Sequence, residues 1–174
     1  MKRALILAGA CAFLAAPAFA QTPPSQSTPA PAQATPSTAD FVKNAAISGM
    51  FEIQSSELAL RKKVPADRRF AEHMIHDHER IAAQLKHLVR ADHVTAKVPT
   101  ALDDQHKQML DKLRGESGTD FDKDYDQMQQ QGHQEAVALF DAYSQSGDNP
   151  ALKRWAAKTL PELKSHLAMA QKLS

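Results

Sequence analysis

The sequence predicts an all-α protein, a four-helix bundle with a short crossover helix between the second and third long helices. From Thr38 onward, apolar residues recur at helical spacing, and no stretch shows the sustained alternation of apolar and polar residues that is typical of a strand. Proline and glycine interrupt this pattern at only a few places. They divide it into four long segments and one short one, which gives the predicted architecture.

The first two long helices are predicted from the residues at their N-termini. The first covers Ala39–Lys63, where Ser37 or Thr38 would cap the N-terminus through a side-chain oxygen. The second covers about Pro65–Asp92, because proline is well tolerated in the first turn of a helix.

The remaining three helices follow a connection that ends in proline. The short one is predicted over Leu102–Arg114 and would stop at Gly115, a frequent residue after a helix end. A long helix runs from about Thr119 to Ser146, and the last runs from Pro150 nearly to Leu173. Pro161 lies inside this last helix and is expected to kink it or to break it in two.

Residues 1–20 are predicted to be a secretory signal peptide. Lys2 and Arg3 precede an apolar run, and Ala18-Phe19-Ala20 is a small-x-small cleavage sequence. The alternative is a lipoprotein signal with Cys11 as the lipidated residue. Under the first interpretation the protein is exported to the periplasm, and its mature chain contains no cysteine and therefore no thiolate metal ligand.

Residues 21–38 are predicted to be a disordered tether, because proline, alanine, threonine, serine and glutamine dominate them. The folded domain is then 39–174. Removing residues 1–20 takes away two of the 21 basic residues and none of the 20 acidic ones, so the mature chain has a formal charge of −1. This balance does not favour nucleic-acid binding, and the mature chain has no apolar segment of transmembrane length.

The segment Phe70–Val89 has a histidine where an apolar core residue is expected. His78 lies at the centre of its apolar stripe, and a buried imidazole requires a hydrogen-bond partner or a metal ion. His73 and His76 point to the opposite side and are expected to be solvated.

Each of the other long helices also places one possible metal ligand on its inner side: Glu52, His133 and His166. Midpoints of antiparallel helices of similar length lie at one level, so these residues and His78 are predicted to converge in the bundle interior. Three neutral imidazoles and a carboxylate suit zinc, iron, copper or manganese. The alternative is a metal-free cluster held together by hydrogen bonds.

Three short motifs carry a resemblance to a known family. They are Phe70-Ala71-x-x-Met74-Ile75-x-Asp77-His78, Phe121-Asp122-x-x-Tyr125 followed by His133, and Leu160-Pro161 followed by His166. In these motifs the chain resembles the domain of unknown function 4142 family of exported bacterial proteins, over about Asp40–Leu173. The resemblance implies a ferritin-like bundle and no established activity.

The di-iron chemistry of many ferritin-like proteins is not expected, because their Glu-x-x-His motif is absent. The most similar sequence is Glu162-x-x-x-His166, in which the histidine follows the glutamate by four residues instead of three. We therefore expect an exported bundle that binds a single transition-metal ion in a stress, metal-handling or sensing role. Two alternatives are a non-catalytic envelope interaction module, whose polar cluster only specifies packing, and a small metalloenzyme.

Overall fold

The computed structural model describes residues 36–64 and 67–173. These residues form five helices and no strand: α1 (Thr38–Lys62), α2 (Arg68–Ala91), α3 (Asp104–Gly115), α4 (Gly118–Ser146) and α5 (Pro150–Ala170). Four are long, and the short α3 lies between α2 and α4 in the chain. The predicted fold class is therefore confirmed.

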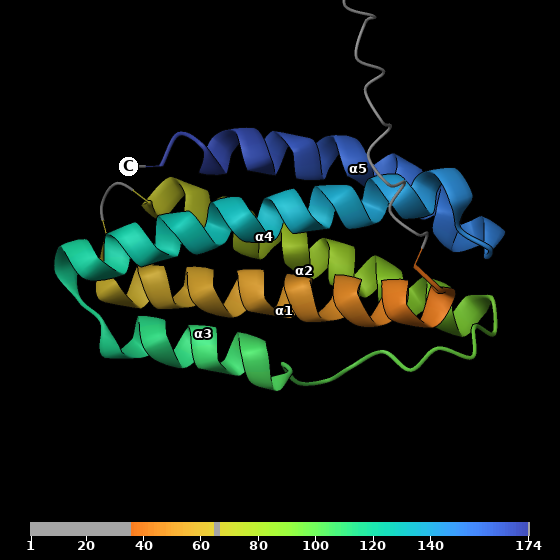
Figure 1. The fold of residues 1–174 in the computed structure, drawn as a ribbon, viewed down its shortest axis with the longest axis horizontal. Helices are drawn as coiled ribbons and strands as arrows, with labels where there is room; N and C mark the ends of the chain where they lie inside the picture. Colours follow the sequence, from red (N-terminus) through yellow and green to blue (C-terminus); the bar gives the residue numbers. More distant parts are fainter. Residues whose placement is uncertain (1–35, 65–66, 174) are drawn as a thin grey trace, which may run out of the picture. The chain divides into compact units, whose positions relative to one another are not determined.

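The four long helices form a bundle in which each helix contacts two others. α1 packs against α2 and α4, and α5 packs against the same two helices. Neighbouring helices run in opposite directions (Figure 1). α2 and α4 consequently run the same way, and the chain must travel back along the bundle between them. An extended connection and α3 make this return, and α3 packs on α1 and α4.

The helix ends follow the expected capping chemistry with small shifts. The Ser37 side chain accepts a hydrogen bond from the backbone N–H of Asp40, as one predicted cap requires. α2 begins at Arg68, three residues after the predicted start at Pro65, which lies outside the described residues. α4 begins at Gly118, slightly before the predicted start. The predicted signal peptide and nearly all of the predicted tether also lie outside the described residues.

Helix α5 continues through Pro161, so the predicted break in this helix does not occur. Proline removes one N–H donor, which leaves the carbonyl of Ala157 without its usual partner in the helix. Both Pro161 and Ala157 are exposed. Water can therefore satisfy the carbonyl, and the packing of the inward face holds the helix together.

The core consists of two apolar clusters, one toward each end of the bundle. On α2, α4 and α5 a histidine lies between residues that belong to one cluster and residues that belong to the other. We call Glu52, His78, His133 and His166 the polar layer; all four are at most 3% exposed. The bundle therefore has an apolar interior interrupted by one polar level.

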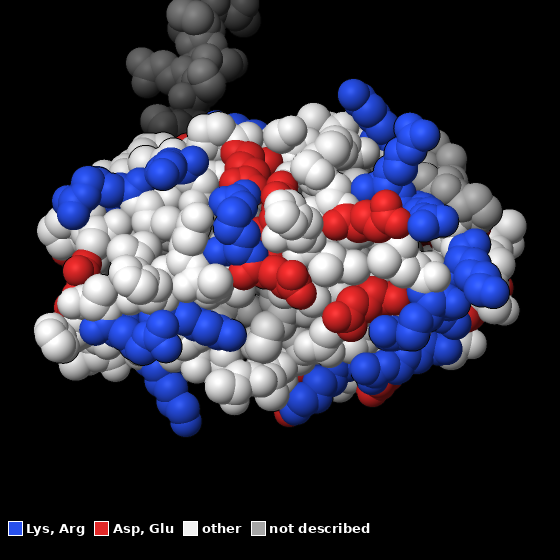
Figure 2. All heavy atoms as spheres, turned by 180° about the vertical axis from the view of Figure 1, so that it is seen from behind, with Lys and Arg blue, Asp and Glu red and all other residues white. Residues whose placement is uncertain are grey.

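The surface carries charges of both signs. Figure 2 shows Lys and Arg interspersed with Asp and Glu on the face seen from behind. Such a mixed face lacks the single-sign field that a nucleic-acid-binding surface requires. Within the described residues, no helix has both the length and the apolar character needed to cross a membrane.

Candidate metal centre

Three histidines from three helices meet in the polar layer. The ring centroids of His78, His133 and His166 are 5.3–5.6 Å apart in all three pairs. Each ring offers one nitrogen such that the three nitrogens lie within 4.8 Å of one another. Ligand atoms on a tetrahedral ion are roughly 3.3 Å apart for metal–nitrogen bonds of about 2.0–2.1 Å. The three nitrogens are therefore within about 1.5 Å of the separation that one ion requires.

The tautomer of His133 is set by its own helix. Its Nδ1 lies 2.8 Å from the carbonyl oxygen of Gln129, so Nδ1 carries the proton and donates it. Its Nε2 is buried without a hydrogen-bond partner and bears the lone pair. His133 therefore offers Nε2 to a ligand.

The tautomer of His166 is set by a carboxylate on α2. The Nε2 of His166 lies 3.0 Å from Oδ2 of Asp77, so this nitrogen donates and Nδ1 bears the lone pair. Nδ1 is buried and has no partner. A carboxylate that accepts the second N–H of a histidine is the usual support of a metal-binding imidazole, because it fixes the ring and raises its basicity.

His78 has no hydrogen bond at either nitrogen, although it is only 3% exposed. Gly49 faces it from α1, where an added Cβ would lie 3.8 Å from His78 Nδ1. That distance is an ordinary contact, so the glycine is not required for space. His78 is the member of the group whose tautomer the protein leaves open.

Glu52, the fourth predicted ligand, lies beside the histidine group and not within it. Its Oε1 is 3.9 Å from His133 Nδ1, on the side of that ring that donates to the backbone. An added Cβ at Gly132 would approach Oε1 to 2.9 Å, so this glycine makes room for the carboxyl group. The structure therefore brings together three of the four predicted ligands and places the fourth at their edge.

Burial keeps these groups uncharged in the metal-free protein. Burial lowers the pKa of His133 to about 4, against a smaller upward effect of its hydrogen bond to Gln129. It also lowers the pKa values of His78 and His166, and the neighbouring histidines lower that of His78 further. Burial raises the pKa of Glu52 to about 8, against the opposing effect of the Gln129 side chain. At neutral pH the three imidazoles are therefore free of extra protons.

The polar layer concentrates unpaired polar atoms. In the described residues, eight buried side-chain nitrogen or oxygen atoms lack a hydrogen-bond partner, and five of them belong to Glu52, His78, His133 and His166. Each such group costs about 1–3 kcal/mol when it is left unsatisfied. A metal ion that accepted one lone pair from each imidazole would satisfy three of these five atoms.

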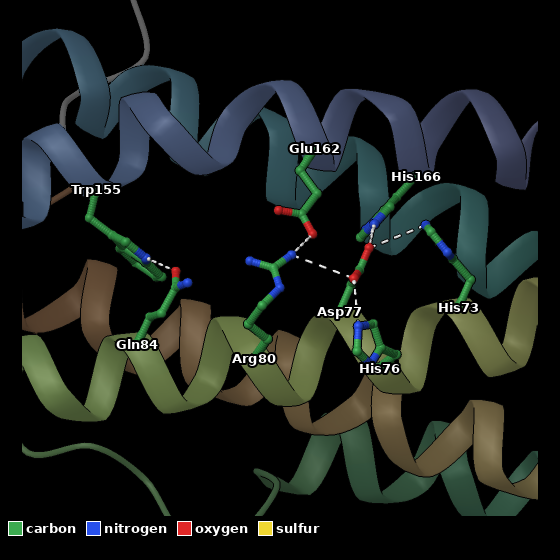
Figure 3. Close-up of polar contacts among 8 residues, drawn as sticks. All are labelled: His73, His76, Asp77, Arg80, Gln84, Trp155, Glu162 and His166. Carbon is green, nitrogen blue, oxygen red and sulfur yellow. Dashed lines mark hydrogen bonds and ion pairs between the residues drawn. The ribbon is translucent and has the colours of Figure 1, made fainter.

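Asp77 is the important residue that the sequence analysis did not select. Figure 3 shows its carboxylate between His166 on α5 and His73 on its own helix. The Nε2 of His73 lies 3.2 Å from Oδ2 of Asp77, and its ring lies 5.4 Å from that of His166. His73 is thus exposed, as expected, but it also contacts Asp77, which the sequence analysis did not predict. The spacing of four residues between His73 and Asp77 was the available signal.

A four-helix bundle with a buried three-histidine group defines a class of helical proteins that can hold a metal ion inside the bundle. This chain belongs to the family described as Domain of unknown function (DUF4142), which matches residues 23–173.

A solved structure has a similar fold: "CopM in the Cu(II)-bound form" matches with a TM-score of 0.62 and 19% sequence identity. The match covers 77% of this chain and 93% of that one. At this identity the likeness shows the fold alone. A comparison with curated proteins finds no match.

Proposed function

We propose that the protein binds one transition-metal ion through His78, His133 and His166, and that it handles metal in the periplasm. The observation that carries this proposal is the set of lone pairs in the buried group. His133 Nε2 and His166 Nδ1 are both unpartnered, while the other nitrogen of each ring is already bonded to the protein. Such an arrangement prepares imidazoles to ligate.

Copper is the ion that the donors favour. Imidazole nitrogen suits zinc, copper, iron and nickel, and among divalent first-row ions Cu²⁺ binds such donors most tightly. The mature chain has no cysteine under the predicted cleavage, which removes thiolate competition. The structurally similar CopM is itself described in a Cu(II)-bound form. Zinc is the natural comparison ion, because it accepts the same three-histidine donor set.

Glu52 supplies charge to the same site. A divalent ion nearby favours the ionised form of a carboxyl group, so binding would release the proton that Glu52 holds in the metal-free protein. The resulting carboxylate would offset one positive charge in a buried location where charge is otherwise expensive. We assign Glu52 this supporting role and leave the three histidines as the direct ligands.

A site that serves only packing explains the geometry less well. Apolar side chains of similar volume would fill the same space without unpaired nitrogens, and replacing unsatisfied polar groups by apolar ones is often neutral or stabilising. His78 has two such atoms. Packing alone gives no reason for them.

The metal content of the protein tests this function. Protein purified from the periplasm without an affinity tag should contain close to one copper or zinc ion per chain by elemental analysis. His133→Leu should lose that ion, while His87→Leu, an exposed residue of α2, should retain it. Copper-free and zinc-free protein that also fails to take up either ion in a titration would contradict the proposal.

The location is tested separately. Cleavage after Ala20 leaves Gln21 as the first residue, so the mass of the protein from a periplasmic fraction should correspond to residues 21–174. A full-length mass, or a lipid attached to Cys11, would contradict this cleavage.

A further inference from the structure

A second group of metal-binding atoms lies next to the buried one, at the surface between α2 and α5. Two imidazole nitrogens converge on one oxygen: His73 Nε2 and His166 Nε2 lie 3.2 Å and 3.0 Å from Oδ2 of Asp77. The three residues offer one ligand atom each within 4.8 Å of one another. Figure 3 shows the three side chains pointing toward one another from two helices.

The other oxygen of Asp77 is held away from this group. Arg80 lies 3.5 Å from Oδ1 of Asp77 and is also paired with Glu162 on α5 (Figure 3). The arginine offsets part of the negative charge and contacts Oδ1, as His76 does at 4.0 Å. Oδ2 is the oxygen that lies against the two imidazoles. Two histidines and one carboxylate are a donor set that divalent transition metals accept.

The exposure of the three side chains decreases from the surface toward the bundle interior. The side chain of His73 is 47% exposed, that of Asp77 is 12% exposed and that of His166 is 1% exposed. His166 also belongs to the buried group. Because its Nε2 is bonded to Asp77, its unpartnered Nδ1 is the nitrogen available to that group. One ring therefore has a nitrogen in each of the two groups.

We propose that His73, Asp77 and His166 form a second metal site, which receives a divalent transition-metal ion from solvent and passes it to the buried histidines. The existence of this outer site stands on its own geometry, and the transfer rests on the proposed function of the buried group. His73 is the residue that distinguishes the outer site, because it takes no part in the buried one.

The shared ring makes the two sites alternatives. A neutral imidazole carries one proton and one lone pair. When Nδ1 of His166 ligates an ion in the buried site, the proton is on Nε2 and is donated to Asp77. When Nε2 ligates an ion in the outer site, the proton is on Nδ1 and points into the buried site. One chain near neutral pH should therefore hold one ion in these two sites, not two.

The outer site can be isolated in a variant that lacks the buried one. His78→Leu removes a ligand of the buried group and leaves the outer three residues unchanged. This variant, checked for helical content by circular dichroism, should bind Cu²⁺ more weakly than the natural protein. Adding His73→Ala should weaken that binding about tenfold or more. Adding His76→Ala instead, a 79% exposed neighbour that lies 4.0 Å from Asp77, should change it less than about twofold.

The transfer is tested by kinetics in the otherwise natural protein, so that it does not depend on a core substitution. In stopped-flow mixing with Cu²⁺, His73→Ala should load about tenfold more slowly than His76→Ala, with the same final affinity and one ion per chain. Equal loading rates for the two variants would overturn the transfer, and two tightly bound ions per chain would overturn the sharing of His166.

The outcomes separate this inference from the proposed function. If the natural protein binds Cu²⁺ through the buried histidines but His73→Ala and His76→Ala behave alike throughout, only the outer site is refuted. If binding depends on His73 and Asp77 and is unaffected by His78→Leu and His133→Leu, the outer site stands and the proposed buried centre is refuted. Absence of Cu²⁺ and Zn²⁺ binding in the natural protein refutes both.

Discussion

An aromatic layer near one end of the bundle and the polar layer near its middle use burial in opposite ways. We define the aromatic layer as Phe41, Phe140, Tyr143 and Trp155. The ring of Phe41 stacks on Tyr143 at 3.9 Å and lies 5.1 Å from Phe140. Trp155 donates its indole N–H to Gln84 at 3.0 Å, and the Tyr143 hydroxyl contacts Thr38. The polar groups of this layer thus have partners.

The polar layer is equally buried and has unpaired atoms on all four of its residues. The aromatic layer shows that the bundle can provide hydrogen-bond partners for buried polar groups where only stability is needed. The polar layer gives up some stability in the metal-free state and would recover it through a ligand. Stability should therefore be independent of metal in the aromatic layer and dependent on metal in the polar layer.

The largest effect is expected from truncation in the aromatic layer. Phe41→Ala removes a fully buried ring and should lower the free energy of unfolding by about 3–5 kcal/mol. The loss should be the same with Cu²⁺ and with a chelator, because Phe41 packs within the apolar cluster that contains Phe140, Tyr143 and Trp155. Urea denaturation of the variant under both conditions measures this. A loss that depends on metal would break the distinction between the layers.

The polar layer should give a different signature. His78→Leu should leave the free energy of unfolding of the metal-free protein unchanged or raise it by up to about 2 kcal/mol, because it removes two unpaired buried nitrogens. The same variant should lose the metal-dependent stabilisation, about 2.7 kcal/mol at a free ion concentration of 100 times Kd. His87→Leu serves as the exposed control on α2. Strong destabilisation of metal-free His78→Leu would mean that the imidazole is needed for packing.

Below about pH 6.5, the buried histidines of the polar layer should make the free energy of unfolding of the metal-free protein depend on pH. Burial lowers the pKa of His133 to about 4, so between that value and about pH 6.5 the unfolded chain binds more protons at this histidine. His78 and His166 act in the same direction. These histidines therefore make unfolding easier as pH falls from about 6.5, by at most about 1.4 kcal/mol per pH unit each, and the opposite slope of Glu52, which extends from about pH 4.5 to 8, offsets the contribution of one of them. Urea titrations between pH 4 and 7 measure the slope, and His133→Leu should reduce it.

Glu52 contributes a slope of the opposite sign, and above about pH 7 the histidines no longer oppose it. The pKa of Glu52 is raised from 4.5 to about 8, so the folded state holds a proton that the unfolded chain has released, and stability falls as pH rises toward 8. Asp126, with a pKa raised to about 7 by burial and neighbouring aspartates, adds a similar slope at lower pH. Glu52→Gln should therefore flatten the curve between about pH 7 and 8. An unchanged slope there would show that Glu52 is already ionised.

The smallest effects are expected at the surface histidines of α2. His76→Ala should change the free energy of unfolding by less than about 0.5 kcal/mol, as exposed substitutions usually do. His73→Ala should cost somewhat more, up to about 1 kcal/mol, because it loses its contact with Asp77. Identical values for the two variants would indicate that the contact with Asp77 contributes nothing to stability.

The inward histidines could be predicted because helical periodicity determines which face of a helix is buried. His78, His133 and His166 each lie on an apolar stripe, and antiparallel packing brings the stripes to one level. Glu52 lies at the edge of its stripe, and its side chain can reach several places. Its position beside Gly132 follows from the packing of α1 against α4, which the pattern of either helix alone does not determine.

Asp77 could not be selected on the same grounds. It directly follows two exposed or half-buried residues and precedes His78, so its side chain points between the buried face and the surface. Its partner is a residue of α5, 89 positions later in the chain. Only the arrangement of the helices places α5 beside α2. Likewise, periodicity places Pro161 off the apolar stripe of α5, but it could not show that the helix would continue through this residue.

Thermal unfolding of metal-stripped protein, with a chelator or with added Cu²⁺, tests the central claim most directly. The account predicts that Cu²⁺ at 100 times Kd raises the Tm of the natural protein by about 5–10 °C, and that His133→Leu abolishes this shift while retaining the helical fold. Superimposable melting curves with and without Cu²⁺, Zn²⁺, iron or manganese near neutral pH would contradict it.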